Sequence, residues 1–93
     1  SAAPVPESLI PRVNLLLALA SLHLTLVGDA ASGLEYLQQA TRLGNDLVGV
    51  LHGAGQRDAT VALFVDMGRA FEGVSKSDAA ACFLLADRLR GSL

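Results

Sequence analysis

The sequence predicts an all-α protein, a compact antiparallel array of four helices within one domain. Three observations lead to this fold class. The 93-residue chain is 52% hydrophobic and only 17% charged, a composition that excludes a disordered chain. Apolar residues recur at spacings of three and four along four segments, which is the period of a helix with one buried face. Short runs of glycine, aspartate and serine separate these segments, and short connections favour antiparallel neighbours.

The N-terminal end of the chain carries all of its prolines, Pro4, Pro6 and Pro11. Proline fixes its own backbone angle and restricts the residue before it, so we expect residues 1–10 to form an extended arm. Residues 11–93 would then form a single helical domain. Since proline suits a first helical turn, the first helix is expected to begin between Pro6 and Pro11 and to run to about Val27.

This first segment is unusual because residues 13–28 carry no charge. The uncharged run is shorter than the about 20 residues of a membrane span and contains polar residues, so we expect no membrane span. Apart from His23 on the opposite side, its polar residues fall on one narrow stripe: Asn14, Ser21 and Thr25. A helix that is apolar on nearly all sides is expected to be central and buried. Leu22, Leu24 and Leu26 alternate with polar residues, which leaves a strand as the alternative at that point.

The second helix has two possible starts. Asp29 is a good N-cap, and residues 32–35 match the capping-box pattern of serine followed by glutamate three residues later. The helical period continues across Gly44, which predicts one helix to about His52. A break at residues 44–46 is the alternative, because glycine inside a helix costs about 1 kcal/mol relative to alanine.

A glycine-rich loop at residues 53–55 is expected before the third helix, with Asp58 as its N-cap. Residues 73–77 would end that helix, and Ser75 or Ser77 would cap the fourth. The stripes expected to be buried are Val61, Phe64, Gly68 and Phe71 in the third helix, and Ala79, Cys82, Phe83, Ala86 and Leu89 in the fourth.

Two segments are weakly similar to one another, GDAASGLEYLQQATRL at 28–43 and VSKSDAAACFLLADRL at 74–89. Each resembles the second helix of a tetratricopeptide repeat, and residues 67–71 resemble that family's first helix. The tryptophan and the closing proline of the family are absent. The long second helix is also similar to that of microtubule-interacting-and-trafficking bundles. The array is therefore a helical bundle or two tetratricopeptide-like hairpins, and either resemblance implies binding of another polypeptide.

No group of residues predicts catalysis, a cofactor or a metal site. His23 and His52 lack a second ligand four residues away, so each is expected to be a core or rim histidine with one hydrogen bond. Cys82 falls on an apolar stripe and is expected to be a small buried residue. We therefore expect a non-enzymatic protein with no cofactor.

Charge and cysteine content bear on partners and compartment. The net charge is −2 and the seven basic residues are scattered, so no nucleic-acid partner is expected. A single cysteine is compatible with the cytoplasm or another reducing intracellular compartment.

The apolar surface exceeds what a domain of this size can bury, which is about 60–65% of the surface of its unfolded chain. The apolar residues expected to remain exposed are Leu9, Ile10, Val65, Leu84, Leu85 and Leu93. Monomers seldom leave a large apolar patch open, so the sequence predicts an interface with a protein partner or a second copy.

Two functions follow from this prediction. The first is a protein–protein interaction module that binds a partner helix or peptide in an apolar groove between helices. The second is a homo-oligomerisation module in which the first or fourth helix packs against its symmetry mate. The residues expected beneath the groove are Leu34, Leu37, Phe64, Phe71 and Phe83. The residues expected to contact the partner are Gln38, Arg42, Val65, Arg69, Leu84 and Leu85.

Overall fold

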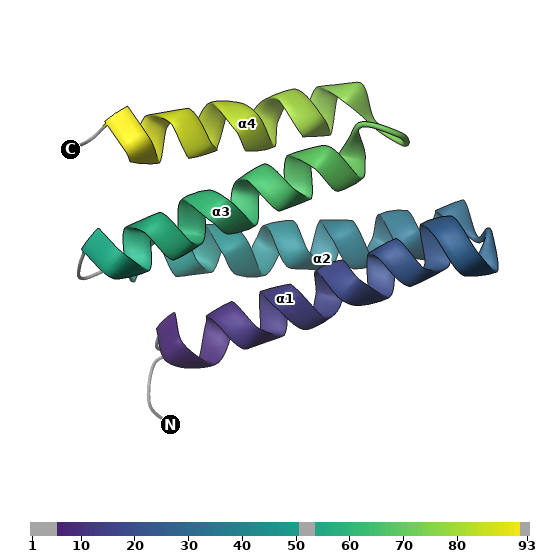
Figure 1. Ribbon diagram of the computed structural model, residues 1–93, viewed down its shortest axis with the longest axis horizontal. Helices are drawn as coiled ribbons and strands as arrows, with labels where there is room; N and C mark the ends of the chain where they lie inside the picture. The colour runs from purple at the N-terminus through teal and green to yellow at the C-terminus, as the bar shows by residue number, and fades with distance from the viewer. Residues whose placement is uncertain (1–5, 51–53, 92–93) are drawn as a thin grey trace.

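A computed structural model describes residues 6–50 and 54–91 of the chain. The elements are α1 (Pro6–Leu22), the π-helical turn η1 (His23–Val27), α2 (Ala30–Val48), α3 (Ala54–Phe71) and α4 (Lys76–Gly91). Successive helices run in opposite directions (Figure 1). Within these residues every regular element is helical, so the predicted all-α, antiparallel four-helix array is confirmed.

The array is flat, with extents of 38 × 32 × 16 Å. α3 lies in the middle and packs against each of the other three helices. Among the described helices, α4 has close backbone contacts with α3 alone, whereas α1 packs on both α2 and α3. In Figure 1, α1 and α4 consequently lie at opposite edges of the array. The outer sides of these two helices therefore face away from the core.

The helix α1 begins earlier than the sequence indicated. Because it starts at Pro6, residues 6–10 are helical, and the expected extended arm is wrong over that stretch; residues 1–5 lie outside the described residues. Pro11 sits inside the helix, where it has no N–H to donate to the Glu7 carbonyl. Leu9 is buried, so the expectation that it is exposed is also wrong.

The stretch with alternating leucines is helical, so the strand alternative is wrong. Its last turn widens to a π-helix, in which the Thr25 hydroxyl donates to the Ser21 carbonyl at 2.7 Å. Gly28 then adopts a left-handed backbone angle, with φ of 76°, and its N–H donates to the His23 carbonyl. This turn ends the helix and redirects the chain into α2.

Asp29 caps α2, as the first of the two predicted starts requires. Its carboxylate accepts from the Ser32 N–H at 3.1 Å and from the Ser32 hydroxyl at 2.6 Å. The helix continues through Gly44 without a break, which confirms the longer prediction there. It ends at Val48 rather than at about His52, which lies outside the described residues. The Val50 N–H instead bonds the Leu47 carbonyl at 3.0 Å and closes a turn.

The start of α3 differs from the prediction, whereas the start of α4 agrees with it. α3 already begins at Ala54, so Ala54 and Gly55 are not in a loop, and Asp58 lies inside the helix instead of capping it. Ser75 caps α4 as predicted. Its hydroxyl accepts from the Asp78 N–H at 3.4 Å and donates to the Asp78 carboxylate at 2.7 Å.

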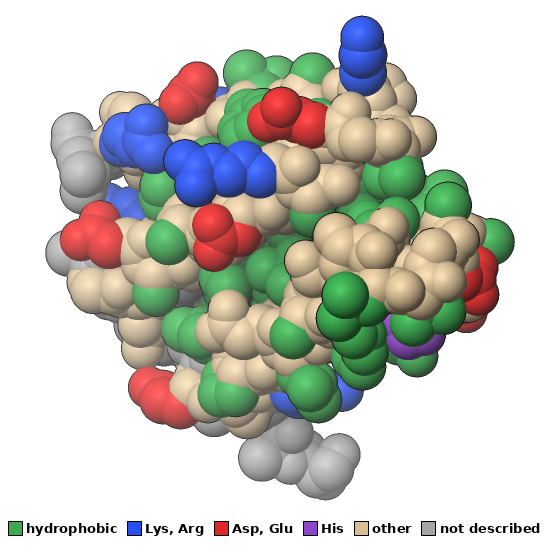
Figure 2. Space-filling view, turned by 45° about the vertical axis from the view of Figure 1, so that its right-hand side comes forward, with side chains coloured by type: hydrophobic (Ala, Val, Ile, Leu, Met, Phe, Trp, Pro, Cys, Tyr) green, Lys and Arg blue, Asp and Glu red, His purple; other side chains and the backbone are tan. Residues whose placement is uncertain are grey.

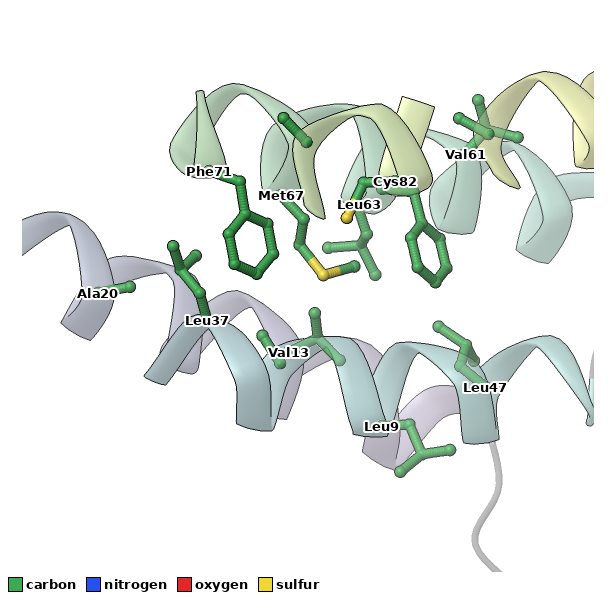
Figure 3. Close-up of a cluster of buried hydrophobic side chains, with 14 residues drawn as sticks. Leu9, Val13, Ala20, Leu37, Leu47, Val61, Leu63, Met67, Phe71 and Cys82 are labelled. Atoms are coloured by element: carbon green, nitrogen blue, oxygen red, sulfur yellow. The ribbon is translucent and has the colours of Figure 1, made fainter. Parts of the chain in front are cut away.

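The core is built around α3. Met67 and Phe71 project from it toward α1 and α2, and Cys82 lies on the facing side of α4 (Figure 3). The ring of Phe64 is also buried and lies against Gly44 of α2. The predicted stripe of α3 is buried throughout, whereas Leu63 and Met67 were not foreseen as core residues. In α4 the predicted Ala79, Cys82 and Ala86 are buried, and Phe83 and Leu89 are half-buried. Because the buried residues of α4, Ala79, Cys82 and Ala86, are small, α4 can lie close to α3.

Candidate interaction surface

The most apolar helix of the chain is also poorly covered. Glu7–Val27 has 21 residues, and its most apolar 18-residue stretch has a mean hydropathy of 1.6, so by length and composition the helix could cross a membrane. Only 11% of that stretch is buried within the protein. The prediction that this helix is central and buried is therefore wrong. The reason is that α1 lies at an edge and uses one side only, where Val13 and Ala20 are fully buried against its neighbours.

Four leucines follow one line along the outer side of α1 and η1: Leu15, Leu19, Leu22 and Leu26. We call this line the leucine face. Leu15 is 61%, Leu22 42% and Leu26 81% exposed, and Leu19 is half-buried. Their spacing of four, three and four residues is the a/d spacing by which a helix packs against another helix. Figure 2 shows hydrophobic side chains gathered around the histidine at one end of this region.

Two polar side chains beside the leucine face, Thr25 and His23, have a hydrogen-bond partner within the chain. The Thr25 hydroxyl donates to the Ser21 carbonyl. The His23 ring lies with Nδ1 2.8 Å from the Leu19 carbonyl oxygen and its centroid 5.0 Å from that of Tyr36. A contact that covers these two side chains can leave their internal hydrogen bonds in place, which lowers the cost of burying the face.

Opposite charges stand at the two ends of the leucine face. Arg12 precedes Leu15 and is exposed. It takes no part in the ion pair found in the described part of the chain, which joins Arg90 and Asp87 at 3.6 Å. Asp29 follows Leu26 at the start of α2. The hydrogen bond from the Ser32 hydroxyl lowers the pKa of Asp29 from its ordinary value, with a smaller contribution from the Ser32 N–H, so the carboxylate is charged at neutral pH.

His23 and Cys82, which could have been catalytic or metal-binding residues, instead take part in the packing of the helices. His23 is the rim histidine with one hydrogen bond that the sequence predicted. Cys82 is buried as predicted, and burial raises the pKa of its thiol to about 11. No cluster of three or more potential metal ligands occurs among residues 6–50 and 54–91.

The six predicted contact residues do not come together in one site. Arg42 lines a hollow of about 510 Å³ between α1 and α2, and Arg69 lines another of about 670 Å³ where the ends of α1 and α3 meet. Leu85 lines a third hollow, between α2, α3 and α4. Gln38 and Leu84 are exposed, on α2 and α4 respectively, whereas Val65 is half-buried against the core.

The hollow beside Leu85 corresponds to the predicted groove between helices. Of the five residues expected beneath the groove, Phe64 and Phe71 line this hollow, whereas Leu34, Leu37 and Phe83 do not. Thr41 and Asn45 of α2 also line it. Its volume is about 130 Å³, and both phenylalanines are only 1% exposed. A helix with its side chains is about 10–12 Å across, so this hollow has room for a side chain and not for a helix. The apolar side chains of the leucine face are far more exposed than those two phenylalanines.

Comparison of the chain with protein-family models, with curated proteins and with solved structures finds no match. The resemblance to tetratricopeptide or trafficking bundles therefore stays a prediction. The leucine face itself was missed because an uncharged helix was interpreted as central. The signal that identifies it is the four–three–four spacing of its leucines.

Proposed function

We propose that this chain is a non-enzymatic protein-interaction module that binds an amphipathic helix along the leucine face of α1. One observation carries the proposal: the longest apolar, uncharged segment of the chain is exposed along one continuous line. Monomeric proteins rarely leave such a patch uncovered. The a/d spacing of the leucines is what a second helix needs for knobs-into-holes packing.

The energetics favour a helix as the occupant. Burying one fully exposed leucine contributes about 1.5–3 kcal/mol. Because Leu15, Leu22 and Leu26 are only partly exposed and Leu19 is half-buried, covering the leucine face contributes on the order of 3–6 kcal/mol. Association costs an estimated 4–15 kcal/mol in lost motion and side-chain ordering. Burial of the leucine face alone would therefore leave little net free energy of binding. A partner that brings its own apolar stripe adds further apolar contact, and an amphipathic helix supplies such a stripe in the matching geometry.

Site-specific photo-cross-linking tests this proposal. Leu26 is 81% exposed and Leu84, on α4, is 53% exposed, so each tolerates replacement by p-benzoyl-phenylalanine without disturbing the core. Irradiation of the protein in its own cells should attach a polypeptide to position 26 and none to position 84. Adducts from position 84 alone would place the interface on α4 and contradict the proposal. Lipid adducts alone at position 26 would also contradict it.

A further inference from the structure

We infer that the occupant of the leucine face is the same face of a second copy of this chain, with the two α1 helices antiparallel. The inference rests on the proposed function and names its partner. It is carried by three properties of the face: the order of its leucines, the charges at its ends, and its place at the edge of the array.

The spacing of the leucines is the same in both directions along the helix. Leu15, Leu19, Leu22 and Leu26 are separated by four, three and four residues. An isologous contact requires a surface that is complementary to itself after a twofold rotation. An antiparallel pair meets this requirement, because Leu15 then faces Leu26 of the partner subunit and Leu19 faces Leu22 of the partner subunit.

The charges favour the same orientation. Arg12 lies three residues before Leu15, Asp29 lies three residues after Leu26, and no charged residue lies between them. Antiparallel pairing brings Arg12 of each copy near the partner's Asp29, whereas parallel pairing would place arginine beside arginine. Like charges in contact are disfavoured, so complementarity selects the antiparallel arrangement.

Both charged groups are available for this contact. Arg12 is exposed and forms no ion pair with any described residue. The other charge near the start of α1, Glu7, accepts a hydrogen bond from the Gln56 side chain of α3 at 3.2 Å. Each Asp29 oxygen accepts one bond from Ser32, and a carboxylate oxygen has a second lone pair for another donor.

The position of α1 permits the pairing. α1 and α4 occupy opposite edges of a flat array (Figure 1), so a second array can meet α1 edge to edge. A lipid surface fits the face less well. Helices that lie in a membrane interface are rich in lysine and arginine, whereas Arg12 is the sole basic residue of α1 and η1, and the chain has a net charge of −2.

Cysteine cross-linking tests the register. In the antiparallel pair, positions 15 and 26 of different copies are adjacent, whereas position 15 is about 16 Å along the axis from position 15 of the other copy. A disulfide needs Cα atoms within about 7 Å. Mild oxidation of mixed Leu15→Cys and Leu26→Cys chains should yield the mixed dimer, and neither variant alone should cross-link. The wild-type chain is the control, because its Cys82 is buried.

Other outcomes overturn the inference. A disulfide formed by Leu15→Cys alone would show parallel pairing. No mixed disulfide, together with binding of the wild-type chain to vesicles of phosphatidylcholine and phosphatidylglycerol, would show that lipid covers the face. No mixed disulfide, with a different polypeptide cross-linked from position 26, would overturn self-pairing and leave the proposed function standing. If neither a mixed disulfide nor a polypeptide cross-link from position 26 formed, the proposed function would be overturned as well.

A charge variant tests the ends of the face. Arg12→Glu should weaken the dimer about three- to tenfold, because it places two carboxylates together at each end. Arg12→Lys keeps the charge and should dimerise as the wild-type chain does. The dissociation constants can be compared by sedimentation equilibrium at low salt. An Arg12→Glu dimer as tight as the wild type would contradict the antiparallel register.

Discussion

Leu24 packs directly over Gly33, so closely that a Cβ atom at Gly33 would lie 2.5 Å from the Leu24 Cγ atom. The carbonyl oxygen of Ala20 is also near, at 3.4 Å from the same position. The missing side chain lets α1 and η1 approach the start of α2. This contact turns Leu24 inward, while Leu22 and Leu26 on either side of it stay exposed.

Gly33→Ala should therefore destabilise the protein. Overpacking costs about 1–3 kcal/mol, which outweighs the up to 1 kcal/mol that alanine gains over glycine in a helix. The free energy of unfolding from urea titration measures the difference. Gly55→Ala is the matched control, because a Cβ there meets nothing within 4 Å, and it should be neutral or stabilising. A Gly33→Ala variant as stable as Gly55→Ala would contradict the close contact.

Gly68→Ala should loosen α4 selectively. A Cβ at Gly68 would lie 2.6 Å from the Phe83 ring, and α4 has close backbone contacts with α3 alone among the described helices. We expect faster amide hydrogen exchange in Lys76–Gly91 than in the wild type, with little change in α2. Exchange followed by mass spectrometry makes the comparison. Equal acceleration in all helices would argue against α4 as a separately opening unit.

Asp29 should make stability depend on pH in the acid range. Because the Ser32 hydrogen bonds lower its pKa in the folded state, its contribution is present above the ordinary value of 3.8 and is lost as the pH falls through the lower folded-state pKa. The stability difference between the wild type and Asp29→Ala should thus shrink below about pH 4. Ser32→Ala, which removes the hydroxyl donor, should reduce the same pH dependence. A difference that stays constant down to pH 2 would contradict this role.

Cys82 should resist alkylation in the folded protein. Burial raises the pKa of its thiol from 9.0 to about 11, which lowers the thiolate fraction at pH 8 roughly a hundredfold, and the side chain is also inaccessible. Iodoacetamide at pH 8 should modify native protein far more slowly than urea-unfolded protein, as followed by intact mass. Equal rates for the two states would show that the packing of α4 on α3 does not shield the thiol.

The sequence predicted those elements that depend on local chemistry. Asp29 and Ser75 are caps because a side-chain oxygen bonds an N–H three residues later, and that interaction lies within one short segment. Phe64 and Phe71 are core residues because helical spacing places them on one side of α3. Local rules were insufficient at Ala54, where the helix begins before the strongest capping residue, Asp58.

The position of α1 could not be predicted in this way. Leu9 and Leu15 belong to the same helix, yet one is 1% exposed and the other 61%. Helical periodicity indicates which residues share a side, but not which side meets another helix when every side is apolar. The number of neighbouring helices decides that, and α1 has neighbours on one side only. Three of the expected contact residues, Arg42, Arg69 and Leu85, line three different hollows.

The molar mass in solution tests the central claim, that the leucine face is a protein interface between two copies. Light scattering should be measured over a hundredfold concentration range for the wild type, for Leu15→Gln/Leu26→Gln, and for Leu84→Gln as the exposed-leucine control. We predict a mass that rises toward twice 9.6 kDa for the wild type and for Leu84→Gln, and a monomer for the double variant. A wild-type mass of 9.6 kDa throughout, or a dimer unaffected by the double variant, would contradict the claim.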